Sequence, residues 1–105
     1  MTPWDGLPKW VRIIGKRYKT RVVEKVDDEE SDGESCPVSQ TLTLKEAHGF
    51  ENARDTALHE SIHGVDHQMH LNLSEQQVEG LGTGILALLR ENPAFVRWLM
   101  AREKE

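Results

Sequence analysis

The chain has 105 residues, enough for one domain with a modest hydrophobic core and too few for two. Its formal net charge of -5 argues against nucleic acid as the main partner, because phosphate binding needs a basic face. No apolar run approaches the roughly 20 residues that cross a bilayer, and the start of the chain lacks the basic-then-apolar order of a signal peptide. We therefore expect a single cytoplasmic domain, residues 1–105, without a membrane partner.

The first half of the chain predicts a small antiparallel sheet. Residues 1–9 are typical of an irregular arm, in which Trp4 docks on the domain. Trp10 to Val26 is rich in β-forming residues and is broken at Gly15, which predicts a hairpin. Residues 38–44 alternate and contain several threonines, which predicts a third strand. If this strand lies at the sheet edge, its free amides along Thr41–Leu44 would bind an extended peptide.

Residues 27–35 are dense in acidic and turn-forming residues, so we expect a mobile acidic loop. Calcium binding is the alternative for these carboxylates, but their spacing lacks the order of an EF-hand. The lone Cys36 has no partner for an internal disulfide, which fits a reducing compartment, and we interpret it as structural.

The second half of the chain predicts three helices. The first runs from Asn52, as N-cap, to Leu71, with an apolar stripe of Leu58, Ile62, Val65 and Met69. Residues 74–77 have the form of a capping box and open a second helix that ends at residue 91. Asn92 and Pro93 begin a last short helix, whose Phe95, Trp98 and Leu99 are expected to point inward. The predicted fold class is α+β, a three-stranded antiparallel sheet packed on a pair of helices plus a short C-terminal helix.

The first helix contains an H-E-x-x-H motif formed by His59, Glu60 and His63. Histidines four residues apart lie on one helix face about 6 Å apart along the axis, so both imidazoles can reach one small cation. Glu60 is rotated by about 100° from His59, beside the metal, where a carboxylate can take a proton from an activated water. The motif therefore predicts two zinc ligands and a general base.

A catalytic zinc site usually has a third protein ligand. His67 and His70 lie too far along a straight helix to share the ion and are interpreted as rim residues. Glu75 or Glu79 on the second helix would reach the pair if that helix folds back antiparallel, and geometry alone does not choose between them. Glycines at positions 82 and 84 would let the two helix backbones approach closely.

The run Asp55-Thr-Ala-Leu-His-Glu-Ser-Ile-His-Gly-Val-Asp-His, with Leu73-Ser-Glu-Gln-Gln-Val-Glu-Gly-Leu-Gly-Thr-Gly-Ile-Leu after it, resembles small phage and prophage proteins related to the ImmA/IrrE metallopeptidases. These belong to the gluzincins, so the resemblance implies a zincin-like helix pair. It also implies zinc held by His59, His63 and Glu79, with Glu60 as the base. Asp66, one turn after His63, would orient an imidazole; its alternative is a plain surface aspartate.

By the same resemblance the reaction would be peptide hydrolysis in a cytoplasmic protein, with a transcription repressor as the first substrate class to test. No residue is marked for oxyanion stabilisation; Tyr18, His67 and His70 are the candidates. The rival hypothesis is a non-catalytic interaction protein, a phage-encoded inhibitor or decoy of a host protein, in which zinc joins the two helices. A fourth protein ligand, His70 or Glu75, would favour that rival. In a third reading the site holds no metal and the histidines line a groove.

Overall fold

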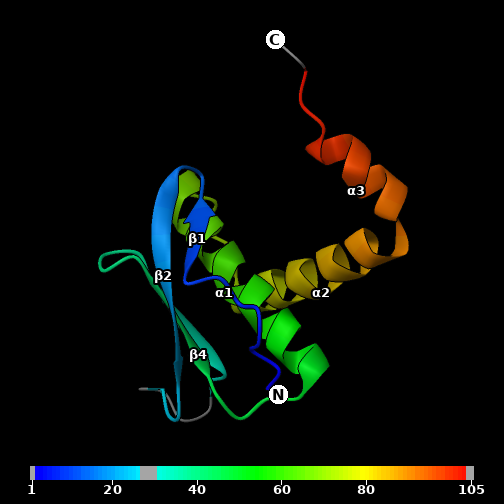
Figure 1. The fold of residues 1–105 in the computed structure, drawn as a ribbon. Coiled ribbons are helices and arrows are strands. Elements are labelled where there is room, and N and C mark those ends of the chain that lie inside the picture. The colour runs from blue at the N-terminus through cyan, green and yellow to red at the C-terminus, as the bar shows by residue number, and fades with distance from the viewer. Residues whose placement is uncertain (1, 27–30, 104–105) are drawn as a thin grey trace.

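The computed structural model describes residues 2–26 and 31–103. These residues form an α+β fold in which a four-stranded sheet faces a layer of helices (Figure 1). The three helices lie on one side of the sheet, with α1 directly against it and α2 beyond α1. The elements in chain order are β1 (Trp10–Ile13), β2 (Lys16–Val23), β3 (Gly33–Cys36), β4 (Thr41–Lys45), α1 (Phe50–Met69), α2 (Glu75–Glu91) and α3 (Pro93–Met100).

The sheet differs from the predicted three-stranded antiparallel one. Its order is β1-β2-β4-β3, with β1 and β3 antiparallel to their neighbours and a parallel pair, β2 and β4, at the centre. The additional strand, β3, comes from the end of the acidic segment, where composition alone predicted a loop. Because β3 pairs with β4, the Thr41–Leu44 segment lies inside the sheet, and its prediction as an edge strand is wrong.

The predicted hairpin between Trp10 and Val26 is confirmed as β1 and β2. Its two-residue turn consists of Ile14 and Gly15, with φ angles of 48° and 83°. Two consecutive positive φ angles are the signature of a type I′ turn, whose twist matches that of the strands it joins. Gly15 adopts this conformation freely, whereas a β-branched residue such as Ile14 is strained in it.

The acidic segment is only partly a loop. Residues 27–30 lie outside the described residues, and Gly33 to Ser35 belong to β3. Gly33 is required there by close packing, because a Cβ atom would lie 2.9 Å from the Thr43 carbonyl oxygen and 3.1 Å from Cγ of Glu60. Cys36 ends the strand as an exposed free thiol.

The hydrophobic core lies between the sheet and α1. Tyr18, Leu42 and Leu44 are almost fully buried on the sheet face that α1 covers. The predicted docking of Trp4 is confirmed, since its indole packs against Leu44 and Ala53 and Nε1 donates to the Glu46 carbonyl oxygen at 3.1 Å. The arm thereby closes one end of the core.

The helix α1 begins two residues before the predicted N-cap, and Gly49 takes that position. Its buried residues are Ala53, Thr56, Glu60, Ile62 and Gly64. Of the predicted apolar stripe, Ile62 is buried, Leu58 and Val65 are half-buried and Met69 is exposed. The physical reason is that α1 packs on the sheet with one side and on α2 with another. The side facing the sheet uses small and polar residues, which a search for apolar periodicity does not detect.

The capping box at the start of α2 is confirmed. The Gln77 amide donates to Ser74 Oγ at 3.1 Å, and the Ser74 amide donates to Gln77 Oε1 at 2.8 Å. The expected close approach of α1 and α2 occurs at Gly82, where a Cβ atom would lie 3.7 Å from the backbone of His59. Around Gly84 such an atom would find nothing within 4 Å, so this glycine plays no part in the approach.

The C-terminal helix α3 packs only on α2 among the described elements. Phe95, Trp98 and Leu99 are exposed by 45%, 73% and 45%, so the prediction that they point inward is wrong. Figure 1 shows the reason: α3 turns away from the sheet and reaches no surface that could cover it. Within residues 2–26 and 31–103 no helix is both long and apolar enough to cross a bilayer.

Candidate metal centre

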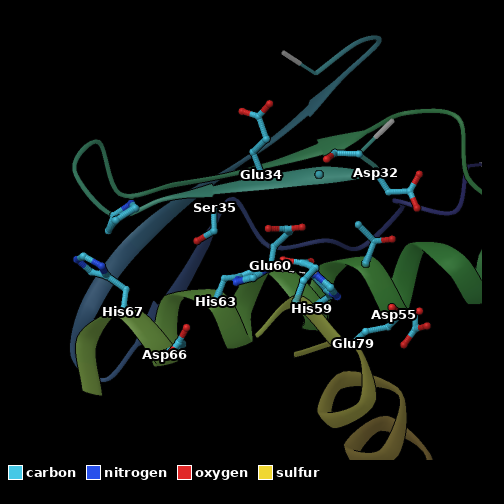
Figure 2. Close-up of a pocket in the computed structure, with 15 residues that line it drawn as sticks. Asp32, Glu34, Ser35, Asp55, His59, Glu60, His63, Asp66, His67 and Glu79 are labelled. Atoms are coloured by element: carbon cyan, nitrogen blue, oxygen red, sulfur yellow. Dashed lines mark hydrogen bonds and ion pairs between the residues drawn. The ribbon is translucent and has the colours of Figure 1, made fainter. Parts of the chain in front are cut away.

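An open groove of about 940 Å³ runs between β3, α1 and the start of α2 (Figure 2). Its floor is the exposed flank of α1, and β3 forms one wall. The sequence predicted the motif helix and the second helix as its sides, whereas β3 was missed. The polar side chains that line it are Asp32, Glu34, Ser35, Asp55, His59, Glu60, His63, Asp66, His67, Glu75 and Glu79, among others.

Three side chains of this groove converge on one point. His59 Nε2 and His63 Nε2 are 3.2 Å apart, because their positions on α1 differ by one turn. From α2, Glu75 places Oε1 at 2.6 Å from His59 Nε2 and Oε2 at 3.1 Å from His63 Nε2. Among the described residues these three form a group whose ligand atoms all lie within 4.8 Å of one another.

The group has the composition and spacing of a zinc ligand set. Two ligands of a tetrahedral zinc ion with bonds of about 2.0–2.1 Å are separated by roughly 3.3 Å. The two imidazole nitrogens are 3.2 Å apart, so they already have that separation. The distance between His59 Nε2 and the Glu75 carboxylate oxygen is 2.6 Å, as in a hydrogen bond, and would increase to the same separation when zinc binds. In the part of the chain that the structure describes, no fourth ligand joins the group, which matches the open position of a catalytic site.

The structure brings Glu75, not Glu79, to the two imidazoles. Glu79 lines the same groove one turn further along α2, but its carboxylate is not in the group of three. The difference follows from where the helices meet. Val78 and Gly82 are the buried positions of α2, and the glycine touches α1 beside His59, so the first turn of α2 lies over the motif histidines.

Electrostatics hold Glu75 in its ionised form. Partial burial raises the pKa of this carboxyl, but hydrogen bonds from His59 and His63 outweigh that effect, so the pKa lies below its ordinary value. The carboxylate is therefore available as an anionic ligand at neutral pH.

Glu60 lies between α1 and β3, with only 6% of its surface exposed. Its carboxyl has no hydrogen-bond or ion-pair partner among the described residues, and it lines the groove beside His63. Burial raises its pKa to about 7; the nearby Glu75, Glu34 and Asp32 add to this effect and His63 opposes it. A carboxylate with this pKa accepts and returns protons at neutral pH, which is the property required of a general base.

The structure separates the remaining candidates. Asp66 accepts a hydrogen bond from the Leu73 amide at 3.1 Å, so its carboxylate stabilises the turn between α1 and α2. It also lines the groove, and its role in orienting an imidazole stays a prediction. Tyr18 is buried in the core, 1% exposed, and is not among the groove residues. His70 ends α1 in the left-handed conformation, outside the groove, whereas His67 lies on its rim. Of the three oxyanion candidates only His67 faces the site.

Sequence reasoning missed the wall that β3 contributes. The available signal was Gly33, a single glycine followed by Glu-Ser-Cys before the strand predicted over residues 38–44, which fits a short strand under close packing. Comparison with protein-family models, with curated proteins and with solved structures gives no match.

Proposed function

We propose that this protein is a zinc-dependent metallopeptidase. The observation that carries the proposal is the convergence of His59, His63 and a glutamate of α2, 2.6–3.3 Å apart, next to a buried carboxylate in an open groove. Two imidazoles and one carboxylate with an open fourth position form the ligand set of many zinc hydrolases. This supports the H-E-x-x-H interpretation and the resemblance to the ImmA/IrrE metallopeptidases.

When bound, zinc would polarise a carbonyl oxygen and lower the pKa of water. Glu60 would accept one proton from the attacking water while the oxygen bonds to the scissile carbon. The same carboxyl would then give the proton to the departing amine as the C–N bond breaks. The pKa of about 7 would allow both steps at neutral pH, and this role is supported by the position of Glu60 in the groove that His63 also lines.

The substrate would lie along β3 rather than along the predicted Thr41–Leu44 segment. Among the described strands β3 pairs with β4 and forms one edge of the sheet, and an extended peptide would add to this edge as a further strand. Gly33, Glu34 and Ser35 of this strand line the groove opposite the histidines. An added peptide strand would thus run past the metal ligands and Glu60. A cytoplasmic protein, with transcription repressors tested first, remains the proposed substrate class.

Metal analysis tests the ligand set. We expect the purified protein to bind one zinc ion per chain and His59→Ala to lose it. Because Glu75 and Glu79 line one groove but only Glu75 contacts the imidazoles, Glu75→Ala should weaken zinc binding and Glu79→Ala should retain it. The reverse result would assign the ligand to Glu79, and full zinc in all three variants would refute the site.

Proteolysis is tested separately with Glu60→Gln. This variant keeps the ligands and the shape of the side chain, so it should bind zinc normally and lose cleavage of helix-turn-helix repressors or a cytosolic protein library. Cleavage that persists in the variant comes from a contaminant. Full zinc binding without cleavage by the wild-type protein would favour the rival, a zinc-stabilised interaction protein.

A further inference from the structure

The face of the sheet opposite α1 carries no helix in the described part of the chain (Figure 1). Successive side chains of a strand point to opposite faces. Tyr18 is buried under α1, so Arg17, Lys19 and Arg21, its odd-numbered neighbours on β2, point to the uncovered face, and all three are exposed. The register places Arg12 opposite Arg17 on that face.

This face holds a set of cations that pair with no carboxylate of the described residues. Within residues 2–26 and 31–103, no ion pair joins Arg12, Arg17, Lys19 or Arg21 to an acidic side chain. Moreover, Arg12 and Arg17 are direct cross-strand neighbours, and like charges in this arrangement destabilise a sheet. An anionic ligand would relieve the repulsion, so the charge of this face is complementary to a polyanion.

The ring of Trp10 lies next to these cations on the same face. Trp10 lies opposite Lys19 on β1 and is 46% exposed, and the Arg17 guanidinium lies 4.1 Å from the centre of its ring. On the other side of β2, the hydroxyl-bearing Thr41 and Thr43 of β4 are the register partners of Lys19 and Arg21. Aromatic rings and guanidinium planes stack nucleobases, while hydroxyls and cations bind phosphates.

We propose that the outer face of β1, β2 and β4 binds single-stranded nucleic acid, with Trp10 and Arg17 stacking a base and Arg12, Lys19 and Arg21 contacting phosphates. A four-stranded sheet is too wide for a duplex groove, which admits a helix or a two-stranded ribbon, and a duplex hides the base faces that Trp10 would stack. Glu34, at the far edge on β3, points away from α1 in Figure 2 and would confine the strand to the β1–β2 side.

The basic character of this face cannot be seen in the net charge of the whole chain, which is negative. Residues 9–25 contain seven lysines and arginines and one glutamate, whereas the rest of the chain holds six basic and seventeen acidic residues. Of the acidic residues, Asp55, Glu60, Asp66, Glu75 and Glu79 belong to the helices and line the groove. The proposal does not depend on the zinc site, since none of the residues that would contact the nucleic acid lines the groove.

Fluorescence anisotropy with a labelled oligothymidine of about 15 nucleotides tests the proposal on the full chain. The variant Arg12→Gln/Lys19→Gln/Arg21→Gln removes the three charges that would contact phosphates. Its matched control, Lys9→Gln/Lys16→Gln/Lys25→Gln, removes three exposed charges from strand ends and loops of the same hairpin. Because each single-strand phosphate contact contributes about 0.7 to the slope of log affinity against log salt, the first variant should lower the slope by about 2 and the affinity at least about tenfold.

The control triple variant should bind within about twofold of the wild type. Trp10→Leu should weaken binding by about fivefold or more and leave the salt slope unchanged, because base stacking is not an ionic contact. Equal losses in both triple variants, an unchanged Trp10→Leu affinity, tighter binding of a duplex or of anionic vesicles, or no binding at about 50 mM salt would each overturn the proposal.

Discussion

Replacing Glu60 by glutamine should stabilise the metal-free protein at high pH and leave its stability at low pH nearly unchanged. Burial raises the pKa of Glu60 from 4.5 to about 7, so the folded protein holds this proton more tightly than the unfolded chain does. The free energy of unfolding that Glu60 contributes therefore falls as the pH rises from about 4.5 to about 7 and is constant above that window. At about 1.4 kcal/mol per pKa unit, the cost of ionising the buried carboxyl reaches about 3 kcal/mol.

The glutamine side chain has a similar shape and does not titrate, so the variant escapes this cost. Urea denaturation of both proteins with a chelator present, from about pH 4.5 to about pH 8.5, gives the difference in free energy of unfolding. Taking the difference cancels the titration of other groups. We expect it to grow from near zero to about 3 kcal/mol in favour of the variant and to shrink when zinc is added, because a cation favours the ionised carboxylate. A difference that is independent of pH would show that Glu60 is not a desolvated carboxyl.

Three further predictions concern the scaffold. Ile14→Asn should raise the free energy of unfolding by about 1 kcal/mol in urea denaturation, since asparagine tolerates the positive φ of 48°; a loss of stability would contradict the type I′ turn. Gly33→Ala should cost about 1–3 kcal/mol, because the added methyl meets the Thr43 carbonyl oxygen at 2.9 Å, and an unchanged denaturation midpoint would show that β3 does not pack as described. Ending the chain at Asn92 should leave zinc content unchanged, since α2 is the only described element on which α3 packs; metal analysis of the shortened protein that found less zinc would contradict this.

The elements with strong local signals were predictable from the sequence. The capping box at Ser74, the proline that opens α3 and the glycine in the first hairpin each specify a local backbone conformation, and the structure has all three features. The motif histidines could be placed together because a helix fixes their spacing. The choice between Glu75 and Glu79 could not be predicted, because it depends on the angle and offset at which α2 crosses α1. The contact of Gly82 with α1 determines both, and the sequence alone does not show this contact.

Sheet order and surface charge needed the structure for a similar reason. The Gly33–Cys36 strand is too short and polar to show a period, so neither β3 nor the interior position of Thr41–Leu44 was visible. The net charge of -5 is a sum over the chain, whereas partners contact one face at a time. The cations of β2 recur at every second residue, and only the burial of Tyr18 shows which face they occupy.

The contact between Gly33 and Glu60 couples the edge strand β3 to the proposed general base on α1. Glu60 Cγ is only 3.1 Å from the site that a Cβ on Gly33 would occupy, so β3 covers the carboxylate. The distance between β3 and α1 therefore sets how much water reaches this carboxylate. A peptide that pairs with β3 would reduce the motion of this strand and, by the same step, change the pKa of Glu60. Amide exchange of β3 and the titration of Glu60 should therefore change together when a peptide binds.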